Sequence, residues 1–418
     1  MGGLPVLSAT TAALNRNSHL LDWYLMPEAY SAPLVHDAIR EFAIAPGETV
    51  LDPFCGTGTT VVAAMLQGRN GLGVEVNPFL CFATRVKTRR DHNLPLLRSH
   101  VDRILSAARV RLDGACDNAV AQSDVPLPDM PRLERWIARK VACKVAMLRL
   151  CIEENTSEAT RDVPMLALAA ILRGASNMKL SPHAFGSREV KQDAPVLTMF
   201  ESRVTKMLED IEWLAGEGAH RTLGRADVVN GDIRAVLGME HDLLPVKLAI
   251  CSPPYLNNLD YTMQTRMELF FLGMVNSMEE LKGLRKRMMI CDAKATYRDI
   301  KDWQRVEEVD SVREVARLID DRLGDRGWGW DYGRMTRQYF GGLLRAMEAV
   351  RPMLAPGAPL VMILGESAHA GVLVPVPDLT AELGRLAGYT DAEVRPLRTR
   401  RSSSHGFSLK ESAVVLRN

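Results

Sequence analysis

The segment Ser252-Pro253-Pro254-Tyr255 directly follows a strand-like apolar run, VKLAIC. Neither proline can donate a ladder hydrogen bond, so the chain must leave the sheet here in a stiff, extended turn. Such a turn holds the Ser252 hydroxyl and the Tyr255 ring in a fixed pose at the carboxyl edge, where open α/β sheets bind their ligands. On these residues alone, an ordinary strand exit fits the pattern equally well.

A second stretch, DPFCGTGTT at 52–60, has the glycines of a ligand-binding loop. Its spacing is neither G-x-G-x-x-G nor G-x-x-x-x-G-K-[ST], and without a lysine it is a poor cradle for a triphosphate. Gly56 and Gly58 let the backbone approach a ligand and expose the N–H groups of a following helix. Glu75 ends the next strand-like run, where an acid can accept hydrogen bonds from ribose hydroxyls; a solvated strand end explains it equally well.

The elements that must position these residues alternate between strand and helix patterns. A helix over 30–44 precedes a strand at ETVLDPF, a helix at VVAAMLQG and a strand at NGLGVEV, which together predict a βαβ unit around the glycine loop. Strand-like runs return at 222–237 and 245–255. They are followed by a helix from Tyr339 to Met353, the strand APLVMILGES, a helix at 379–386, and the runs GYTDAEVRPL and ESAVVLRN.

The composition is that of a globular chain of 418 residues, 47% hydrophobic and 25% charged. This length suits one large domain with insertions, or two domains. The net charge of +1 does not indicate a strongly basic protein, so any surface that binds nucleic acid must come from local clusters of basic residues. The seven cysteines are scattered without a C-x-x-C pair, which favours reduced thiols over a zinc site. The sequence predicts neither a signal peptide nor a membrane span.

The motifs DPFCGTGTT, GLGVEVNP and SPPY, in this order, resemble those of the S-adenosylmethionine-dependent, amino-methylating DNA methyltransferases. The resemblance covers most of the α/β part, roughly half of the chain, and neither insertion. It implies an α/β fold with a Rossmann-like seven-stranded methyltransferase sheet, whose last strand is antiparallel. SPPY in place of DPPY resembles the cytosine-N4 branch of this family.

The resemblance also implies roles for single residues. Glu75 matches the acid that binds the cofactor ribose, and the helix that starts at Ser31 matches the element that holds the methionine end. Asp232, in NGDIRAVL, matches the position beside the adenine amine; a helix N-cap explains it as well, and both roles can hold together. The matching residues of the cofactor loop are Asp52, Phe54, Gly56, Gly58 and Thr59.

Methylation of an amine gives each SPPY residue a task. The cytosine amine is a poor nucleophile because its lone pair is delocalised into the ring. The Ser252 hydroxyl and the Pro253 carbonyl can accept hydrogen bonds from its two N–H groups and turn the nitrogen toward tetrahedral geometry. This is catalysis by positioning. Pro254 keeps the turn stiff, and Tyr255 offers an aromatic face to a base that has flipped out of the duplex.

Two softer signals remain. Cys251 could serve as a nucleophile, but strand alternation points it away from Ser252, so we expect a buried core residue. Basic clusters at 85–92, 282–287 and 395–401 can contact phosphates, or each can be a solvated face balanced by nearby acids. The candidate DNA-binding residues in these clusters are Arg285, Lys286, Arg287, Arg398 and Arg400.

The sequence therefore predicts a cytoplasmic, site-specific enzyme that methylates N4 of a flipped cytosine in double-stranded DNA, using S-adenosylmethionine. Adenine-N6 methylation of DNA, methylation of an RNA amine, and a catalytically silent nucleic-acid-binding subunit stay open as alternatives. A companion restriction endonuclease is a candidate partner. The predicted organisation is an N-terminal helix with the cofactor-binding half (1–87), a helical insertion (88–222), a catalytic half (223–275), a charged insertion (276–335) and C-terminal sheet elements (336–418). Either insertion could read the DNA.

Overall fold

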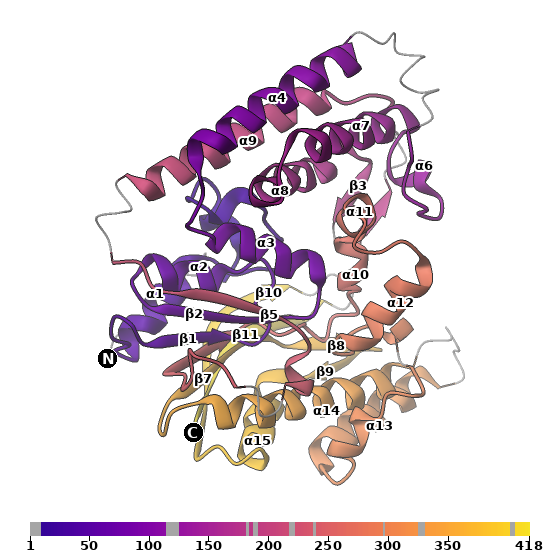
Figure 1. Cartoon of the computed structure of the whole chain (residues 1–418). Helices are drawn as coiled ribbons and strands as arrows, with labels where there is room; N and C mark the ends of the chain where they lie inside the picture. The colour runs from indigo at the N-terminus through magenta and orange to yellow at the C-terminus, as the bar shows by residue number, and fades with distance from the viewer. Residues whose placement is uncertain are drawn as a thin grey trace.

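The computed structural model describes residues 10–113, 125–180, 184–186, 191–216, 222–236, 240–295, 297–324, 331–401 and 406–418. A seven-stranded sheet lies at its centre, between a layer of helices above and a second layer below (Figure 1). The strands in chain order are β1 (Thr49–Asp52), β2 (Asn70–Glu75), β5 (Ala226–Asn230), β6 (Leu248–Cys251), β7 (Pro359–Gly365), β10 (Asp391–Arg401) and β11 (Ser408–Arg417).

The strand order across the sheet is β10-β11-β7-β6-β1-β2-β5. β5, β2, β1, β6 and β7 pair in parallel, whereas β11 runs antiparallel to both of its neighbours. The Rossmann-like methyltransferase sheet with an antiparallel last strand is therefore confirmed. The order reverses between β1 and β6, so the carboxyl ends of these two strands flank the switch point where such sheets bind ligands.

One face of the sheet is covered by three helices from the first part of the chain. Val50 and Ile250 point to this face and share a continuous hydrophobic core with the helices. The helices are α1 (Ala32–Glu41), α2 (Thr59–Leu66) and α3 (Pro78–Thr88).

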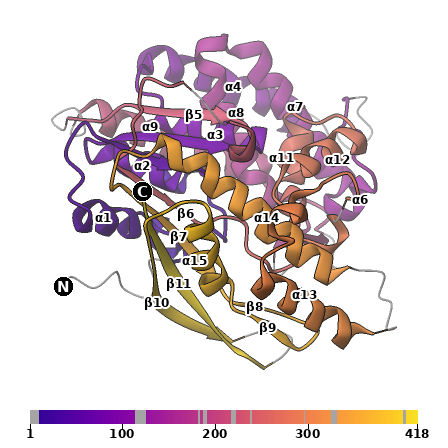
Figure 2. The ribbon, with the colours of Figure 1, turned by 90° about the horizontal axis from the view of Figure 1, so that it is seen from below.

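The opposite face is covered by α14 (Tyr332–Val350) and α15 (Val376–Leu386), which lie against the sheet in the view from below (Figure 2). Leu51 and Cys251, next to the residues of the first face, point to this second core because side chains alternate along a strand. Cys251 is fully buried there, as expected for a core cysteine. α14 begins at Tyr332, earlier than the predicted helix from Tyr339, because Asp331 caps it by accepting from the Arg334 N–H.

The first insertion forms the helical layer that the sequence predicts, stacked beyond α3 in Figure 1. Its hydrophobic side chains belong to the same core as α1, α2 and α3, so the layer is packed onto the sheet half rather than held apart. A two-stranded hairpin of β3 and β4 within it was not predicted, because each strand is only three residues long. The elements are α4 (Leu94–Asp113), α6 (Leu133–Trp136), α7 (Arg139–Asn155), α8 (Glu158–Ala175), β3 (Met178–Leu180), β4 (Ala184–Gly186) and α9 (Val196–Ala215).

The second insertion, which the sequence predicts only as a charged segment, is largely helical over its described residues. α13 (Asp310–Leu323) buries Val312, Ala316 and Ile319 at helical spacing, but charged residues between them mask the pattern. α12 (Met278–Arg287) is capped by the Ser277 hydroxyl and ends in three basic residues. The other short elements from the catalytic half onward are η4 (Ile233–Ala235), α10 (Tyr261–Gln264), α11 (Arg266–Phe271), η5 (Ala293–Ala295), η6 (Asp302–Val306), η7 (Arg351–Met353), β8 (Ser367–His369) and β9 (Val372–Val374).

Residues before α1 also contribute to the fold. The short helices η1 (Ala12–Asn15) and η2 (Leu21–Trp23) run between the sheet half and the helical layer. The Trp23 indole N–H donates to Asp210 of α9 at 2.7 Å, and the Lys87 ammonium donates to the carbonyls of Leu21, Tyr24 and Thr57. Burial lowers the pKa of Lys87 to about 7. These bonds tie the N-terminal segment to the glycine loop at Thr57.

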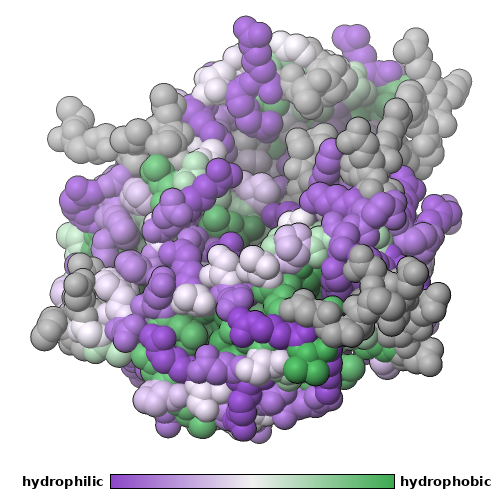
Figure 3. Space-filling view, turned by 90° about the horizontal axis from the view of Figure 1, so that it is seen from above, coloured by the Kyte–Doolittle hydropathy of each residue, from purple (hydrophilic) through white to green (hydrophobic). Residues whose placement is uncertain are grey.

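The surface seen from above is covered mostly by hydrophilic residues, with hydrophobic ones showing between them as smaller patches (Figure 3). Among the helices of the described residues, none combines the length and the apolar composition that crossing a bilayer requires.

Candidate active site

A cavity opens at the carboxyl edge of the sheet, beside the switch point between β1 and β6. Its wall brings together DPFCGTGTT and SPPY, which are far apart in the sequence. The predicted residues that line it are Asp52, Phe54, Gly56, Thr59, Glu75, Asp232, Ser252, Pro253, Pro254, Tyr255, Arg285, Arg287 and Arg398. Four predicted residues do not line it: Ser31, Gly58, Lys286 and Arg400.

Asp52 ends β1 at the floor of the cavity. Its carboxylate accepts from the Tyr30 hydroxyl at 2.8 Å, from the Thr60 hydroxyl at 2.7 Å and from the Phe54 N–H at 3.0 Å. Burial raises the pKa of Asp52 to about 6, although these three donors favour the charged form and limit the rise. Asp52 therefore fixes the start of the glycine loop to α1 and α2.

Glu75 ends β2, next to Asp52, and is only 8% exposed. Its two carboxylate oxygens accept from the N–H groups of Gly56 and Asn77, each at 2.8 Å. Burial raises the pKa of Glu75 to about 7, against the lowering effect of these two bonds. The alternative of a solvated strand end is thus wrong, and an acid in the cavity wall is held in place by backbone donors.

The two glycines of the loop differ in what surrounds them. Gly58 has a φ of 81°, and a Cβ there would lie 2.4 Å from the Thr84 side chain, so any other residue would be strained and would require Thr84 to shift. Gly56 has a φ of 51°, and a Cβ there would meet no atom within 4 Å. Gly58 therefore allows the loop to pack closely against Thr84 of α3, whereas Gly56 faces the open cavity.

Ser31 precedes α1 but turns away from the cavity. Its hydroxyl accepts from the Leu14 N–H at 3.1 Å and donates to the Thr11 carbonyl. Asn15 instead links the start of α1 to the glycine loop. Its side-chain oxygen accepts from the Ala32 N–H at 2.9 Å, and its side-chain nitrogen donates to the Tyr30 carbonyl at 2.9 Å and to the Thr59 hydroxyl at 3.3 Å. The role predicted for Ser31 at the methionine end stays a prediction.

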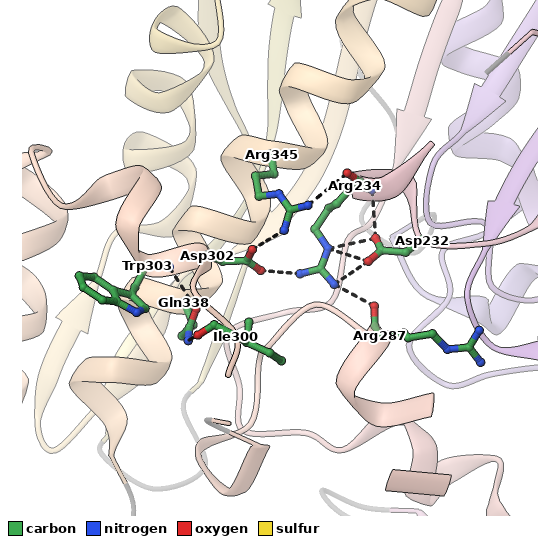
Figure 4. Close-up of polar contacts among 8 residues, drawn as sticks. All are labelled: Asp232, Arg234, Arg287, Ile300, Asp302, Trp303, Gln338 and Arg345. Carbon is green, nitrogen blue, oxygen red and sulfur yellow. Dashed lines mark hydrogen bonds and ion pairs between the residues drawn. The ribbon is translucent and has the colours of Figure 1, made fainter. Parts of the chain in front are cut away.

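Asp232 follows β5, which lies two strands from β1 in the sheet, and lines the cavity. It is the N-cap of η4, which is one of the two roles that the sequence suggested for it. Its carboxylate accepts from the Arg234 N–H at 3.0 Å. The same carboxylate also receives the Arg234 guanidinium, with Nη2 at 2.8 Å (Figure 4). Its predicted place beside the cofactor adenine is compatible with this cap, since the side chain is 21% exposed.

The SPPY turn leaves β6 as predicted. Ser252 lines the cavity, whereas Cys251 points to the core on the other face. Among the described residues, none donates a hydrogen bond to the Pro253 carbonyl oxygen, which leaves it able to accept one from a substrate. The Tyr255 hydroxyl donates to Glu411 of β11 at 2.8 Å, and burial raises the pKa of Tyr255 above its ordinary value.

The predicted DNA-binding residues divide by their partners. Arg285 lies between Asp260, at 3.3 Å, and Asp292. Lys286 pairs with Asp299 at 2.7 Å. Arg398 pairs with Glu411, the residue that holds Tyr255, and Arg400 donates to the Glu366 carbonyl at 3.0 Å.

Arg287 differs from the other four. Its side chain is exposed at the cavity mouth, and no carboxylate of the described residues lies within ion-pairing distance of it. Figure 4 shows its guanidinium pointing away from the cluster around Arg234.

Comparisons with known proteins support this interpretation of the site. A family model described as "DNA methylase", of the N6/N4 group, matches residues 13–84, which hold the glycine loop and Glu75. The Type II methyltransferase M.BsoBI of Geobacillus stearothermophilus is 22% identical over 96% of this chain and 85% of its own length. These matches support a relationship to the amino-methylating DNA methyltransferases.

Two further relatives agree with this assignment. The Type II methyltransferase M.AvaI of Anabaena variabilis is 23% identical over 93% of this chain and 83% of its own length. The Type II methyltransferase M.MjaI of Methanocaldococcus jannaschii is 57% identical, but over 10% of this chain and 14% of its own length. The long matches include both insertions, which the motifs alone did not cover.

Several residues of this methyltransferase site were not found by sequence reasoning. Tyr30, Glu28 and Tyr261 line the cavity, and Glu411 and Asp260 anchor Tyr255 and Arg285. Tyr30 is the first residue of the helix predicted over 30–44, and Asp260-Tyr261 closely follow SPPY, so their positions carried a signal. Glu411 carried one too, as a charged residue directly before the apolar part of the predicted final strand ESAVVLRN.

Proposed function

We propose that this DNA methyltransferase transfers a methyl group from S-adenosylmethionine to the N4 amine of a cytosine flipped out of double-stranded DNA. The observation that carries the proposal is the cavity that Ser252 and Pro253 share with Gly56 and Glu75. It offers acceptors for an amine at one side and an acid beside a glycine loop at the other. A methyl acceptor and a methyl donor therefore both have a place in it.

The residues present fit the cofactor. Gly56 leaves open space where a side chain would stand, and Glu75 presents a fixed carboxylate beside it for ribose hydroxyls. S-adenosylmethionine, when bound, supplies an electrophilic methyl group on its sulfonium. Asp232 would accept from its adenine amine, and the segment from Glu28 to Ser31 would lie at its methionine end. The loop residues assigned to the cofactor are Asp52, Phe54, Gly56, Gly58 and Thr59.

The SPPY turn would hold the target base. The Ser252 hydroxyl and the Pro253 carbonyl can accept hydrogen bonds from the two N–H groups of the amine, which weakens the conjugation of the nitrogen lone pair with the ring. Transfer would form the N–CH3 bond as the S–CH3 bond breaks, would leave S-adenosylhomocysteine, and would release one amine proton to solvent. The prolines Pro253 and Pro254 keep the turn rigid, so the acceptors need no reorganisation during the reaction. The Tyr255 ring, fixed by Glu411, supports a stacking role for the extruded base.

The surroundings of the cavity support a DNA substrate. Arg287 is an exposed cation at the mouth, and we assign phosphate contact to it first, with Arg285, Lys286, Arg398 and Arg400 as weaker candidates because they have partners within the chain. Target reading would fall to the helical insertion, the second insertion, or both. The relatives are Type II methyltransferases, so we propose site-specific modification in the cytoplasm beside a companion restriction endonuclease.

Adenine-N6 methylation is the second candidate, because two acceptors beside a stacking tyrosine suit either amine. SPPY favours cytosine only through the resemblance. An RNA substrate is less well supported by DNA-methyltransferase relatives, and a silent subunit would not need both an intact glycine loop and SPPY.

One experiment separates these outcomes. The purified protein is incubated with methyl-labelled S-adenosylmethionine and either plasmid DNA or RNA, which is then digested to nucleosides and analysed by mass. We expect label in N4-methyl-2′-deoxycytidine from the DNA. Label in N6-methyl-2′-deoxyadenosine would move the proposal to the second candidate, label only in RNA would overturn the substrate, and no label would favour a silent subunit.

A further inference from the structure

Arg234 is the centre of a buried ionic cluster that touches the cavity wall (Figure 4). Its side chain is 5% exposed. Two of its nitrogens reach Asp232, with Nη2 at 2.8 Å and Nε at 3.0 Å, and Nη1 reaches Asp302 at 2.6 Å. The Nη2 atom also donates to the Arg287 carbonyl at 2.8 Å. One guanidinium thus joins the predicted adenine-binding carboxylate to the second insertion.

Asp302 is held against α14 by close backbone packing. A Cβ at Gly341 would lie 1.9 Å from the Asp302 carbonyl oxygen, so this helix position needs a glycine despite the usual cost of about 1 kcal/mol. Gln338, one turn earlier, bonds the Trp303 N–H at 3.1 Å and the Ile300 carbonyl at 2.5 Å. Arg345 binds the second oxygen of Asp302 at 2.5 Å. The 3% exposed Asp302 therefore has both carboxylate oxygens in fixed contacts.

A cluster of this kind is a weak source of stability, because two buried charges gain little more from each other than they lose by leaving water. Its geometry instead fixes an orientation. Planar contact of two guanidinium nitrogens with one carboxylate restricts how Asp232 can turn. The open side of Asp232 faces the cavity.

We propose that Arg234 is a positioning residue for cofactor recognition, which orients the Asp232 carboxylate toward the adenine amine and is itself oriented by Asp302. The inference rests on the proposed function, since Asp232 must be the adenine partner. The same guanidinium fixes the end of α12, so the segment that carries Arg287 is anchored to a cofactor residue rather than only to its own neighbours.

The test compares two ligands that differ only at the adenine amine. S-adenosylhomocysteine carries the amine, and its 6-deamino purine analogue carries a hydrogen atom in its place. Calorimetry on the wild type should favour the amine by roughly 10- to 100-fold, because the analogue cannot donate a hydrogen bond to the Asp232 carboxylate. Arg234→Met should reduce this ratio to below about 3-fold, since a misdirected Asp232 no longer reads the group.

A second variant and a control keep the test decisive if Arg234→Met does not fold. Asp302→Asn keeps the shape but removes the charge that orients Arg234, and should also lower the ratio. Glu348→Gln removes the ion pair between Glu348 of α14 and Arg305 of η6, which joins the same two segments without touching Arg234, and should keep the ratio.

The outcomes separate the inference from its basis. No preference in the wild type would mean that Asp232 is not the adenine partner, which defeats that assignment in the proposed function. A wild-type preference that persists in Arg234→Met, or in Asp302→Asn when only that variant folds, would overturn the positioning role. Equal loss of affinity for both ligands would do the same, because general damage to the site cannot tell an amine from a hydrogen atom.

Discussion

Glu75 shows how a single residue can trade stability for a binding site. Burial raises its pKa from 4.5 to about 7, so the folded protein holds a proton there that the unfolded chain releases at lower pH. The proton is bound in both states below pH 4.5. As pH rises toward and through 7 the folded state must give it up, and the contribution of Glu75 to stability is lost.

Replacing Glu75 with Gln should therefore stabilise the protein relative to the wild type as pH rises. The difference in unfolding free energy, variant minus wild type, should increase by up to about 3 kcal/mol between pH 4.5 and pH 7.5. Urea unfolding at the two pH values measures it, with Glu348→Gln at the surface of α14 as the control for removing one carboxylate. A difference that does not change with pH would contradict a raised pKa at Glu75.

Ser252 tests the chemistry at the other side of the cavity. Ser252→Ala removes one acceptor for the amine and leaves the prolines and β6 unchanged. Single-turnover methylation should slow by roughly 10- to 100-fold, or about 1.4–2.7 kcal/mol, while the affinity for S-adenosylmethionine stays close to that of the wild type.

Tyr255→Phe is the matched variant for the same turn. It keeps the aromatic face but loses the hydroxyl that binds Glu411, so DNA binding should fall less than in Tyr255→Ala.

Full activity in Ser252→Ala would remove the SPPY turn from the proposed reaction.

At the scale of the elements, the glycine loop joins β1 to α2. We expect substitution of its two glycines to have different effects, one on stability and the other on cofactor binding. Gly58→Ala would press a Cβ onto Thr84 at 2.4 Å and should lower stability. Gly56→Ala meets no atom within 4 Å, so it should fold with a penalty of about 1–2 kcal/mol for its positive φ, yet bind the cofactor poorly. Thermal unfolding and calorimetry on both variants provide the comparison.

The opposite result, normal cofactor affinity in a folded Gly56→Ala, would mean that the cofactor does not approach this loop. A folded Gly58→Ala with normal stability would mean that Thr84 can move aside.

The central strands were predictable because they are apolar, and β1 and β6 run directly into the turn motifs DPFCGTGTT and SPPY. The helices of the second insertion were missed, because the three buried residues of α13 recur at helical spacing within a segment that reads as charged. The same limit applies to side chains. Asp232 was recognisable from its motif, but nothing in the sequence near Arg234 indicates that its partner is Asp302, which is brought close only by folding.

At the scale of the whole molecule, the N-terminal segment and the second insertion meet around one cavity, and the helical layer packs behind the cofactor half of the sheet. The layer shares its core with α1, α2 and α3, and the N-terminal segment is bonded to both α9 and the glycine loop. α12 reaches the mouth of the cavity, where Arg285 and Lys286 are paired with Asp292 and Asp299 of the same insertion. Arg287, the next residue, is exposed and has no carboxylate partner among the described residues.

This distribution predicts that two adjacent cations of α12 behave differently toward DNA. Arg287→Ala removes an exposed guanidinium with no carboxylate partner among the described residues. Affinity for duplex DNA should weaken for all sequences alike, and the slope of log affinity against log salt should fall by about 0.9 if one phosphate contact is lost. Lys286→Ala changes the net charge by the same amount but removes a cation already paired with Asp299 at 2.7 Å, so its slope should stay near that of the wild type. Fluorescence anisotropy with a labelled duplex between 50 and 300 mM salt would measure both slopes. Equal slopes in the two variants would mean that pairing within α12 does not decide which cation meets the DNA, and a wild-type slope in Arg287→Ala would place the phosphate contacts on the helical layer instead.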